Sequence, residues 1–233
     1  GNSDGSTLAA LVSGGTEGNF KFVAPTIELS AKSEDYAAYG IQALNTFVDF
    51  TGDTLKVSAS SNTASKGFAL LAASADITAT INGLTSIYSS GTGLYSWKNY
   101  AAEPTISITS SSNLVQVGSI GVRSDGENAS VNLIATGEKT VVDEDTQTNL
   151  TGTNVIDAKS TGLMTQNSGT ISLTANQNNS IIATTALWAD SGVISLKADN
   201  ANHIDATNYG LFIDKSGYGL LDVTNGVNRI AAG

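Results

Sequence analysis

The sequence predicts an all-β chain wound as a parallel β-helix, a solenoid of about eight coils. A phrase in which apolar and small polar residues alternate returns along the chain, as in residues 25–31, 128–135 and 169–175. Self-similarity at a period of roughly 20 to 50 residues is typical of a stacked, quasi-one-dimensional fold. Helical periodicity is almost absent, because Gly, Ser, Thr and Asn recur too often, and Pro occurs only at Pro25 and Pro104.

The spacing of the phrase favours three short strands per coil. Successive central apolar residues are separated by 28, 22, 29, 25, 40, 23 and 27 residues. All but one of these intervals suit a coil with tight corners. An antiparallel sandwich would give turn signals every ~8 to 12 residues without a longer repeat. Right-handed winding is taken by analogy with parallel β-helices. The markers are Ile27, Leu55, Ile77, Ile106, Val131, Ile171, Ile194 and Leu221.

Two further landmarks divide each coil. A small residue before an apolar one is expected to open the first strand. A recurring Asn is expected to mark a corner, because Asn tolerates left-handed backbone and bonds its neighbours' backbone. The small residues are Gly40, Gly67, Gly93, Gly121, Gly162, Ala186 and Gly210, and the Asn residues are Asn154, Asn179, Asn202 and Asn228.

Composition argues against several classes of function. Of the 233 residues, 40% are apolar, which is enough for a continuous core. A net charge of -10 with 11 Lys and Arg opposes binding to nucleic acid or anionic lipid. The chain has no Cys, so thiolate metal sites are excluded, and this usage fits a protein that crosses an oxidising periplasm. No stretch reaches the ~18 apolar residues of a membrane span, so membrane insertion is not expected.

The outward positions of the predicted strands would carry any catalytic array. Polysaccharide-cleaving β-helices need converging carboxylates, or a basic residue beside Ca²⁺. The outward residues are uneven in chemistry and form no acidic stack, and the same unevenness argues against an ice-binding surface. The single His, His203, lies beside an apolar residue, so no catalytic residue, metal ligand or cofactor is predicted. The outward residues are Glu28, Lys56, Thr78, Ser107, Asn132, Ser172, Ser195 and Asp222.

The 40-residue interval predicts an insertion at residues 136–153 between coils. Loops that leave a solenoid frequently bind partners. Asp143, Glu144 and Asp145 could collect a cation, but the segment lacks the spaced acids and Gly of a Ca²⁺ loop. We therefore expect a solvated acidic loop and take these three residues as a candidate recognition site.

Aromatic residues crowd into one segment, at Tyr88, Tyr95, Trp97 and Tyr100. Exposed rings with a polar rim stack on sugars or anchor a protein partner, although aromatic stacks also fill protein cores. Alternation places Tyr95 and Trp97 on one side of a strand and Leu94 on the other, so either Leu94 or the two rings face outward. The four rings are candidate ligand-binding residues.

The repeats resemble a known group. The Gly-Ile/Leu phrase, the Gly-x-Ile-x-Leu-x-Ala strand and the Asn-x-Ile-x-Ala strand are similar to passenger repeats of bacterial autotransporter adhesins, over residues 25–232. The resemblance to these type V secretion proteins implies a single β-helical passenger fragment over residues 1–233. It also implies display outside a Gram-negative cell, with the signal peptide removed and the outer-membrane barrel of the family missing.

The functional expectation is a secreted, non-enzymatic cell-surface adhesin that contributes to virulence. Its partner would be a host-surface glycan or protein, or another copy on a neighbouring cell. Many weak contacts along a rigid surface would be multiplied by avidity. Two alternatives stay open: a polysaccharide-cleaving β-helix enzyme, and an inert stalk that presents another domain.

Overall fold

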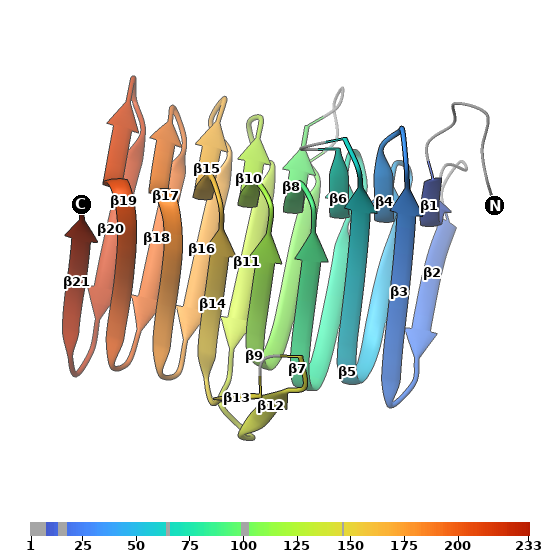
Figure 1. The fold of residues 1–233 in the computed structure, drawn as a ribbon, viewed down its shortest axis with the longest axis horizontal. Coiled ribbons are helices and arrows are strands. Elements are labelled where there is room, and N and C mark those ends of the chain that lie inside the picture. The colour runs from blue at the N-terminus through green and yellow to red at the C-terminus, as the bar shows by residue number, and fades with distance from the viewer. Residues whose placement is uncertain (1–7, 14–17, 64–65, 99–102, 146) are drawn as a thin grey trace.

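The computed structural model describes residues 8–13, 18–63, 66–98, 103–145 and 147–233. Parallel strands stack as a β-solenoid, which confirms the predicted parallel β-helix (Figure 1). Within the described residues, three faces each carry eight stacked strands. The seven steps between eight strands give a rise of about 34 Å at ordinary strand spacing. The first and last described strands, β1 and β21, lie toward opposite ends of this stack.

The first face opens each coil, and small residues there allow a close approach to the third face. A Cβ added to Gly121 would lie 2.4 Å from Ile156 Cγ2. The small residues that precede the first buried apolar residue align from coil to coil as one column. In β6 the member of this column is Ala69, not the predicted Gly67, because Leu70 aligns with Ile41 of the neighbouring strand and Ala69 therefore aligns with Gly40. The strands are β1 (Leu8–Ser13), β4 (Ala38–Ala43), β6 (Gly67–Ala72), β8 (Thr92–Trp97), β10 (Ile120–Asp125), β15 (Thr161–Gln166), and the second halves of β17 (Asn178–Asp190) and β19 (Ala201–Asp214).

The second face is the most regular. Five predicted markers, from Ile77 to Ile194, align in one buried column, as the repeat indicated. The strands are β2 (Gly18–Val23), the first halves of β5 (Thr46–Ser61), β7 (Ile77–Ser89) and β9 (Thr105–Val117), then β11 (Ser130–Ala135), β16 (Thr170–Ala175), β18 (Val193–Ala198) and β20 (Tyr218–Val223).

The third face corrects part of the predicted register. Ile27 and Leu55 pair with each other on this face, so the step from Leu55 to Ile77 crosses between faces. Ile77 pairs instead with Val48, and Leu221 pairs with Leu196. The strands are β3 (Thr26–Ser33), the second halves of β5, β7 and β9, then β14 (Thr153–Ala158), the first halves of β17 and β19, and β21 (Val227–Ala232).

The core runs the length of the stack as one cluster of Ile, Leu and Val side chains from all three faces. Phe50 is the largest side chain in it, and Phe22 stacks on Phe50 with ring centroids 5.2 Å apart. Because inward side chains of one coil rest on those of the next, each coil depends on its neighbours for burial.

Three of the four recurring Asn residues are buried inside the third face instead of lying at a corner. Asn154, Asn179 and Asn202 are fully buried, and none of them has a positive φ. Each side-chain Nδ2 donates to Oδ1 of the Asn in the next coil, at 2.8 to 2.9 Å, from Asn113 to Asn228. Each Nδ2 also donates to a second-face carbonyl, for example Asn179 to the Lys197 carbonyl at 3.0 Å. This asparagine ladder therefore ties coil to coil within the core.

Left-handed backbone gathers at a different corner, between the first and second faces. Asn167 and Ser168, Ser191 and Lys215 take φ of 49°, 67°, 59° and 50° there. These residues lie in the turns that follow β15, β17 and β19. The prediction was wrong because the Asn phrase opens a strand, and its side-chain amide bonds neighbouring coils.

Candidate functional site

The extra residues of the fifth coil fold back as an antiparallel hairpin, β12 (Val141–Asp143) and β13 (Thr148–Leu150). Figure 1 shows it at the lower edge of the stack, beside β9 and β14. Its stems meet at Gly137 and Gly152, whose φ values are 71° and 56°. Both glycine N–H groups donate to the Ser111 carbonyl, at 3.1 and 3.2 Å. The insertion thus enters and leaves the coil at one point.

A cluster of apolar side chains on the outer side of the third face packs against this hairpin. Leu84 of β7 and Leu114 of β9 lie on the outer side of the solenoid, yet both are buried with Leu150 of the hairpin. Val141 and Val155 pack against the same cluster. Apolar side chains at outward positions in three successive coils were a sequence signal for a docked element, and sequence reasoning missed it.

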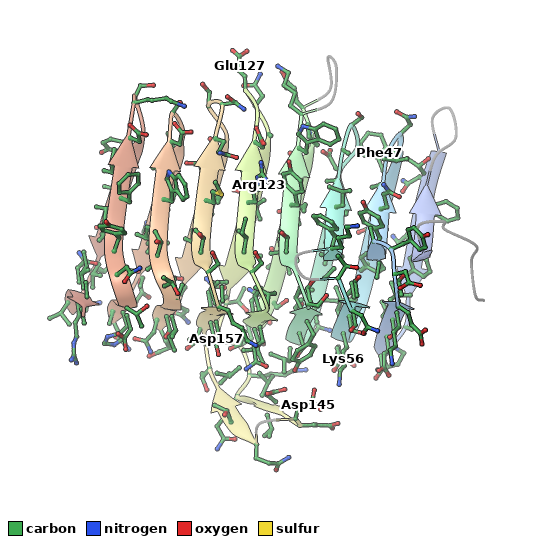
Figure 2. The ribbon with its side chains drawn as sticks, turned by 45° about the horizontal axis from the view of Figure 1, so that its top comes forward. Phe47, Lys56, Arg123, Glu127, Asp145 and Asp157 are labelled. Carbon is green, nitrogen blue, oxygen red and sulfur yellow. The ribbon has the colours of Figure 1, made fainter. Side chains whose placement is uncertain are left out.

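Polar contacts join the hairpin tip to the third face. The Lys56 Nζ lies 2.9 Å from Asp145 Oδ2, and the Tyr88 hydroxyl donates to Asp143 Oδ1 at 3.1 Å. The Lys56 ammonium also lies 5.4 Å from the centre of the Tyr88 ring. Lys56 and Asp145 lie on the same edge of the molecule in Figure 2. The structure therefore brings a predicted aromatic residue together with two of the predicted acidic residues.

The hairpin and the third face border an open groove with a volume of about 440 Å³. Five carboxylates and two ammonium groups line it, together with the Tyr88 ring. Concave sites with a few convergent polar groups are the usual form of a ligand site. Asp143 is only 2% exposed and supports the wall, whereas Glu144 is exposed beside the groove. The groove is thus acidic overall.

Three ionisable groups of the groove, Lys56, Tyr88 and Asp145, have pKa values shifted away from neutrality. The hydrogen bond with Asp145 raises the pKa of Lys56 above its ordinary 10.5, and the same bond lowers the pKa of Asp145 below its ordinary 3.8. Burial raises the pKa of the Tyr88 hydroxyl, and the nearby Asp143 carboxylate raises it further. Lys56 is therefore charged and Tyr88 neutral throughout the physiological range.

The ion pair makes hairpin docking dependent on pH. Because the Asp145 pKa is lowered, its contribution is present above pH 3.8 and is lost as the pH falls through the lowered value. Because the Lys56 pKa is raised, its contribution is present below pH 10.5 and is lost as the pH rises through the raised value. We expect hairpin amides to exchange about two- to fivefold more slowly in the unmodified protein than in Asp145→Asn above pH 3.8, and we expect this difference to disappear as the pH falls through the lowered pKa. Equal pH profiles for the two proteins would contradict this role.

The predicted aromatic cluster is divided between two faces. Tyr88 lies on the third face, whereas Tyr95 and Trp97 lie on the outer side of the first face. Leu94 is fully buried, so the two rings are the outward pair. Tyr100 lies outside the described residues. Tyr88 is therefore separated from Tyr95 and Trp97, and these three rings do not form a single site.

Tyr95 is covered on both sides along the first face. Phe68 stacks on it with centroids 6.3 Å apart, and the Arg123 guanidinium lies 4.7 Å from its centre. Burial raises the pKa of Tyr95 to about 12. Trp97 stacks beside Tyr95 at 6.5 Å and is 41% exposed. Because a sugar needs an open ring face, Trp97 is the better candidate of the two.

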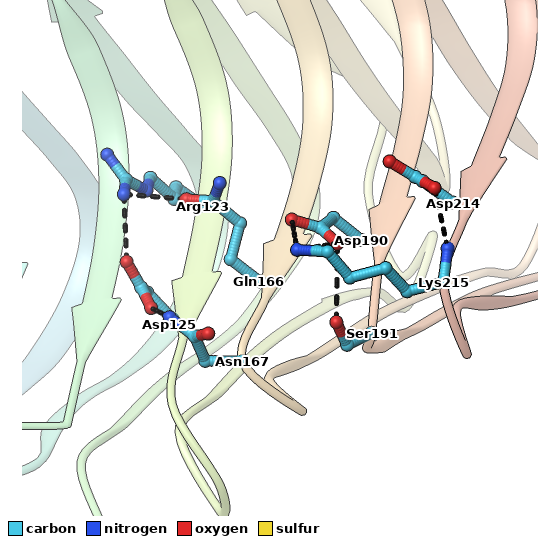
Figure 3. A network of polar contacts seen from close by, with 8 residues as sticks. All are labelled: Arg123, Asp125, Gln166, Asn167, Asp190, Ser191, Asp214 and Lys215. Carbon is cyan, nitrogen blue, oxygen red and sulfur yellow. Dashed lines mark hydrogen bonds and ion pairs between the residues drawn. The ribbon is translucent and has the colours of Figure 1, made fainter.

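Polar side chains at the corner after the first face tie neighbouring coils together (Figure 3). Arg123 Nη2 donates to Asp125 Oδ2 at 2.8 Å and to Gln166 Oε1 of the next coil at 2.7 Å. Asn167 Nδ2 donates to the other Asp125 oxygen at 2.8 Å. These hydrogen bonds join the fifth coil to the sixth, so the network stabilises the stack.

The described residues do not bring a catalytic or metal-binding set together. No group of three His, Cys, Asp or Glu in this part of the chain converges to hold a metal. His203 is exposed on the third face, where Ser180 is its neighbour in the stack. No hydrogen bond joins that pair, whereas a nucleophile and its base need such a bond.

Helices long and apolar enough to cross a membrane do not occur in the described residues. Comparison with protein families, curated proteins and solved structures finds no match for this chain.

Proposed function

We propose that this chain is a non-enzymatic adhesin of passenger type, displayed outside a Gram-negative cell, that attaches to a glycan or protein on a host or neighbouring cell. Recognition would take place in the groove beneath the hairpin. One observation carries the proposal: the insertion is docked through the Leu84, Leu114 and Leu150 cluster and through two polar contacts. A loop held in place before binding loses less entropy when a ligand arrives.

The groove favours binding over acid–base catalysis. A lyase of this shape would need Lys56 as a base, with a pKa lowered toward neutrality. The hydrogen bond with Asp145 shifts the pKa of Lys56 in the opposite direction. A hydrolase would need a carboxylic acid with a raised pKa, whereas the pKa of Asp145 is lowered. These directions support the adhesin proposal over a polysaccharide-cleaving enzyme.

Removal of the hairpin tests the proposal cleanly, because its stems meet. Joining Gly137 directly to Gly152 deletes residues 138–151 at the point where both glycines bond the Ser111 carbonyl. We expect the shortened protein to keep its β-helix, monitored by circular dichroism, and to lose binding to the glycan or matrix protein that the intact chain captures on an array. If the shortened protein still bound, the groove would be excluded as the binding site. If the intact chain captured no glycan or matrix protein, the result would favour an inert stalk.

A point substitution separates the groove from general surface charge. We expect Glu144→Lys, beside the groove, to weaken capture about tenfold or more. Glu127→Lys is the matched control, since Glu127 lies at the opposite edge of the molecule in Figure 2. Equal losses for the two variants would show that net charge, not the groove, governs attachment. Sugar release that a single carboxylate substitution abolishes would also contradict the proposal.

A further inference from the structure

The outer side of the second face carries a lattice of hydroxyl groups, here called the hydroxyl face. It comprises the outward residues of four successive coils, from β7 to β16, and nine of these eleven side chains are Ser or Thr, all exposed or half-buried. The exceptions are Asn132 and Ile134. The nine are Thr78, Thr80, Thr105, Ser107, Thr109, Ser130, Thr170, Ser172 and Thr174.

The observed register reverses a conclusion drawn from the sequence. The predicted outward list was uneven partly because Glu28 and Lys56 belong to the third face. It also placed Asp222 in the wrong column, since Asp222 pairs with Lys197 and not with Ser195. With these removed, the column from Thr78 to Ser195 contains hydroxyl residues and one amide, and the objection to a repeated hydroxyl array no longer holds.

The lattice is periodic in two directions. Neighbouring coils place equivalent side chains about 4.8 Å apart, and residues two apart on one strand lie about 6.7 Å apart. The pairings of β9 with β11 and of β11 with β16 run through six residues without a register shift. Thr side chains are stiff at χ1, so the Thr hydroxyls are held in repeated positions before any contact.

The middle of the lattice is uncharged, and most of its hydroxyls are unpaired. Charged side chains border it, with Lys21 and Asp49 at one end and Lys197 and Asp222 at the other. Asp76, which directly precedes β7, also borders it, and its carboxylate accepts from the Thr105 N–H at 2.8 Å. Thr78 donates to Asp49 at 2.9 Å, and Ser130 donates to Thr105 at 3.2 Å. Six hydroxyls have no hydrogen-bond partner within the described residues. They are Thr80, Ser107, Thr109, Thr170, Ser172 and Thr174.

A periodic array suits a periodic ligand. A single hydroxyl gains little from a soluble ligand, because it exchanges one hydrogen bond to water for another. Ice does not present this competition between ligand and water. The hydroxyl rows can occupy lattice positions of the ordered water itself and keep their hydrogen bonds to water. Oxygen rows in ice repeat on the same scale as these hydroxyl rows. We infer that the hydroxyl face binds ice, independently of the groove beneath the hairpin.

Ice growth in the presence of the full chain tests this inference. We expect measurable thermal hysteresis and partition of the protein into slowly growing ice. Thr109→Lys should reduce the hysteresis about tenfold, because the ammonium group would have to enter the ice lattice without a partner. The matched control is Gln116→Lys, which adds the same charge to the same element, β9, on the third face.

Thermal melting by circular dichroism establishes that both variants are folded at the assay temperature. Gln116→Lys should keep the hysteresis of the unmodified protein. The inference is overturned if the unmodified protein neither delays freezing nor enters ice. Equal losses for the two variants would also overturn it, as would binding to microcrystalline cellulose without any effect on ice.

Discussion

Replacing Asn179 with Ala should lower the free energy of unfolding by about 3 to 5 kcal/mol, because the substitution leaves several buried polar groups without partners. Asn179 donates to Asn202 and to the Lys197 carbonyl, and it accepts from Asn154. Each orphaned group costs about 1 to 3 kcal/mol. Because domains are stabilised by only about 5 to 15 kcal/mol, this loss is large. Chemical denaturation followed by circular dichroism measures it.

Asn178→Ala is the matched control. Asn178 precedes Asn179 in the same strand and is only half-buried. Its replacement should change the unfolding free energy by less than about 0.5 kcal/mol. If Asn179→Ala is no more destabilising than Asn178→Ala, the asparagine ladder contributes no net stability to the stack.

Gly121→Ala should cost about 2 to 3 kcal/mol by overpacking the junction between the first and third faces. The added methyl would lie 2.4 Å from Ile156 Cγ2 and 2.6 Å from the Gly162 carbonyl oxygen. That carbonyl belongs to the next coil and cannot move far without disturbing the parallel ladder. Ala69 and Ala186 occupy the same column in other coils, so we expect a local shift and not complete unfolding. Thermal melting checks the size of the loss.

Two further variants identify the cause. Gly219→Ala is the control, since its added Cβ would have no neighbour nearer than 3.4 Å. The double variant Gly121→Ala with Ile156→Ala should be less destabilised than the sum of its two single changes, because the second removes the clashing methyl. Strict additivity would argue against steric conflict between these two residues.

The fold could be predicted because alternation and a returning phrase are both local properties of the sequence. Register could not, because strands of the second and third faces carry the same apolar alternation. Leu55 and Ile77 therefore look equivalent, although they lie on different faces. The Asn phrase was misinterpreted for a related reason. Asn is favoured at corners, but in a stack of coils an Asn side chain is also stabilised when it hydrogen-bonds the equivalent Asn of the next coil.

The candidate site was predicted in parts. The insertion and the aromatic segment are visible as departures from the repeat. Their meeting depends on contacts between residues far apart in the chain, such as Lys56 with Asp145, 89 positions apart. No local pattern encodes that contact. The sequence does carry one indication of the docked hairpin: Leu84 and Leu114 are apolar at positions where the repeat places polar residues.

The meeting of the two hairpin stems at Gly137 and Gly152 has a consequence for how such a protein can diversify. Since the intervening segment closes on one carbonyl, that of Ser111, its length is independent of the coil that carries it. The entropy of closing a loop grows only slowly with its length. Recombination or slippage between these glycines can therefore exchange one inserted segment for another while the solenoid keeps its winding. The insertion and the scaffold can evolve independently of each other.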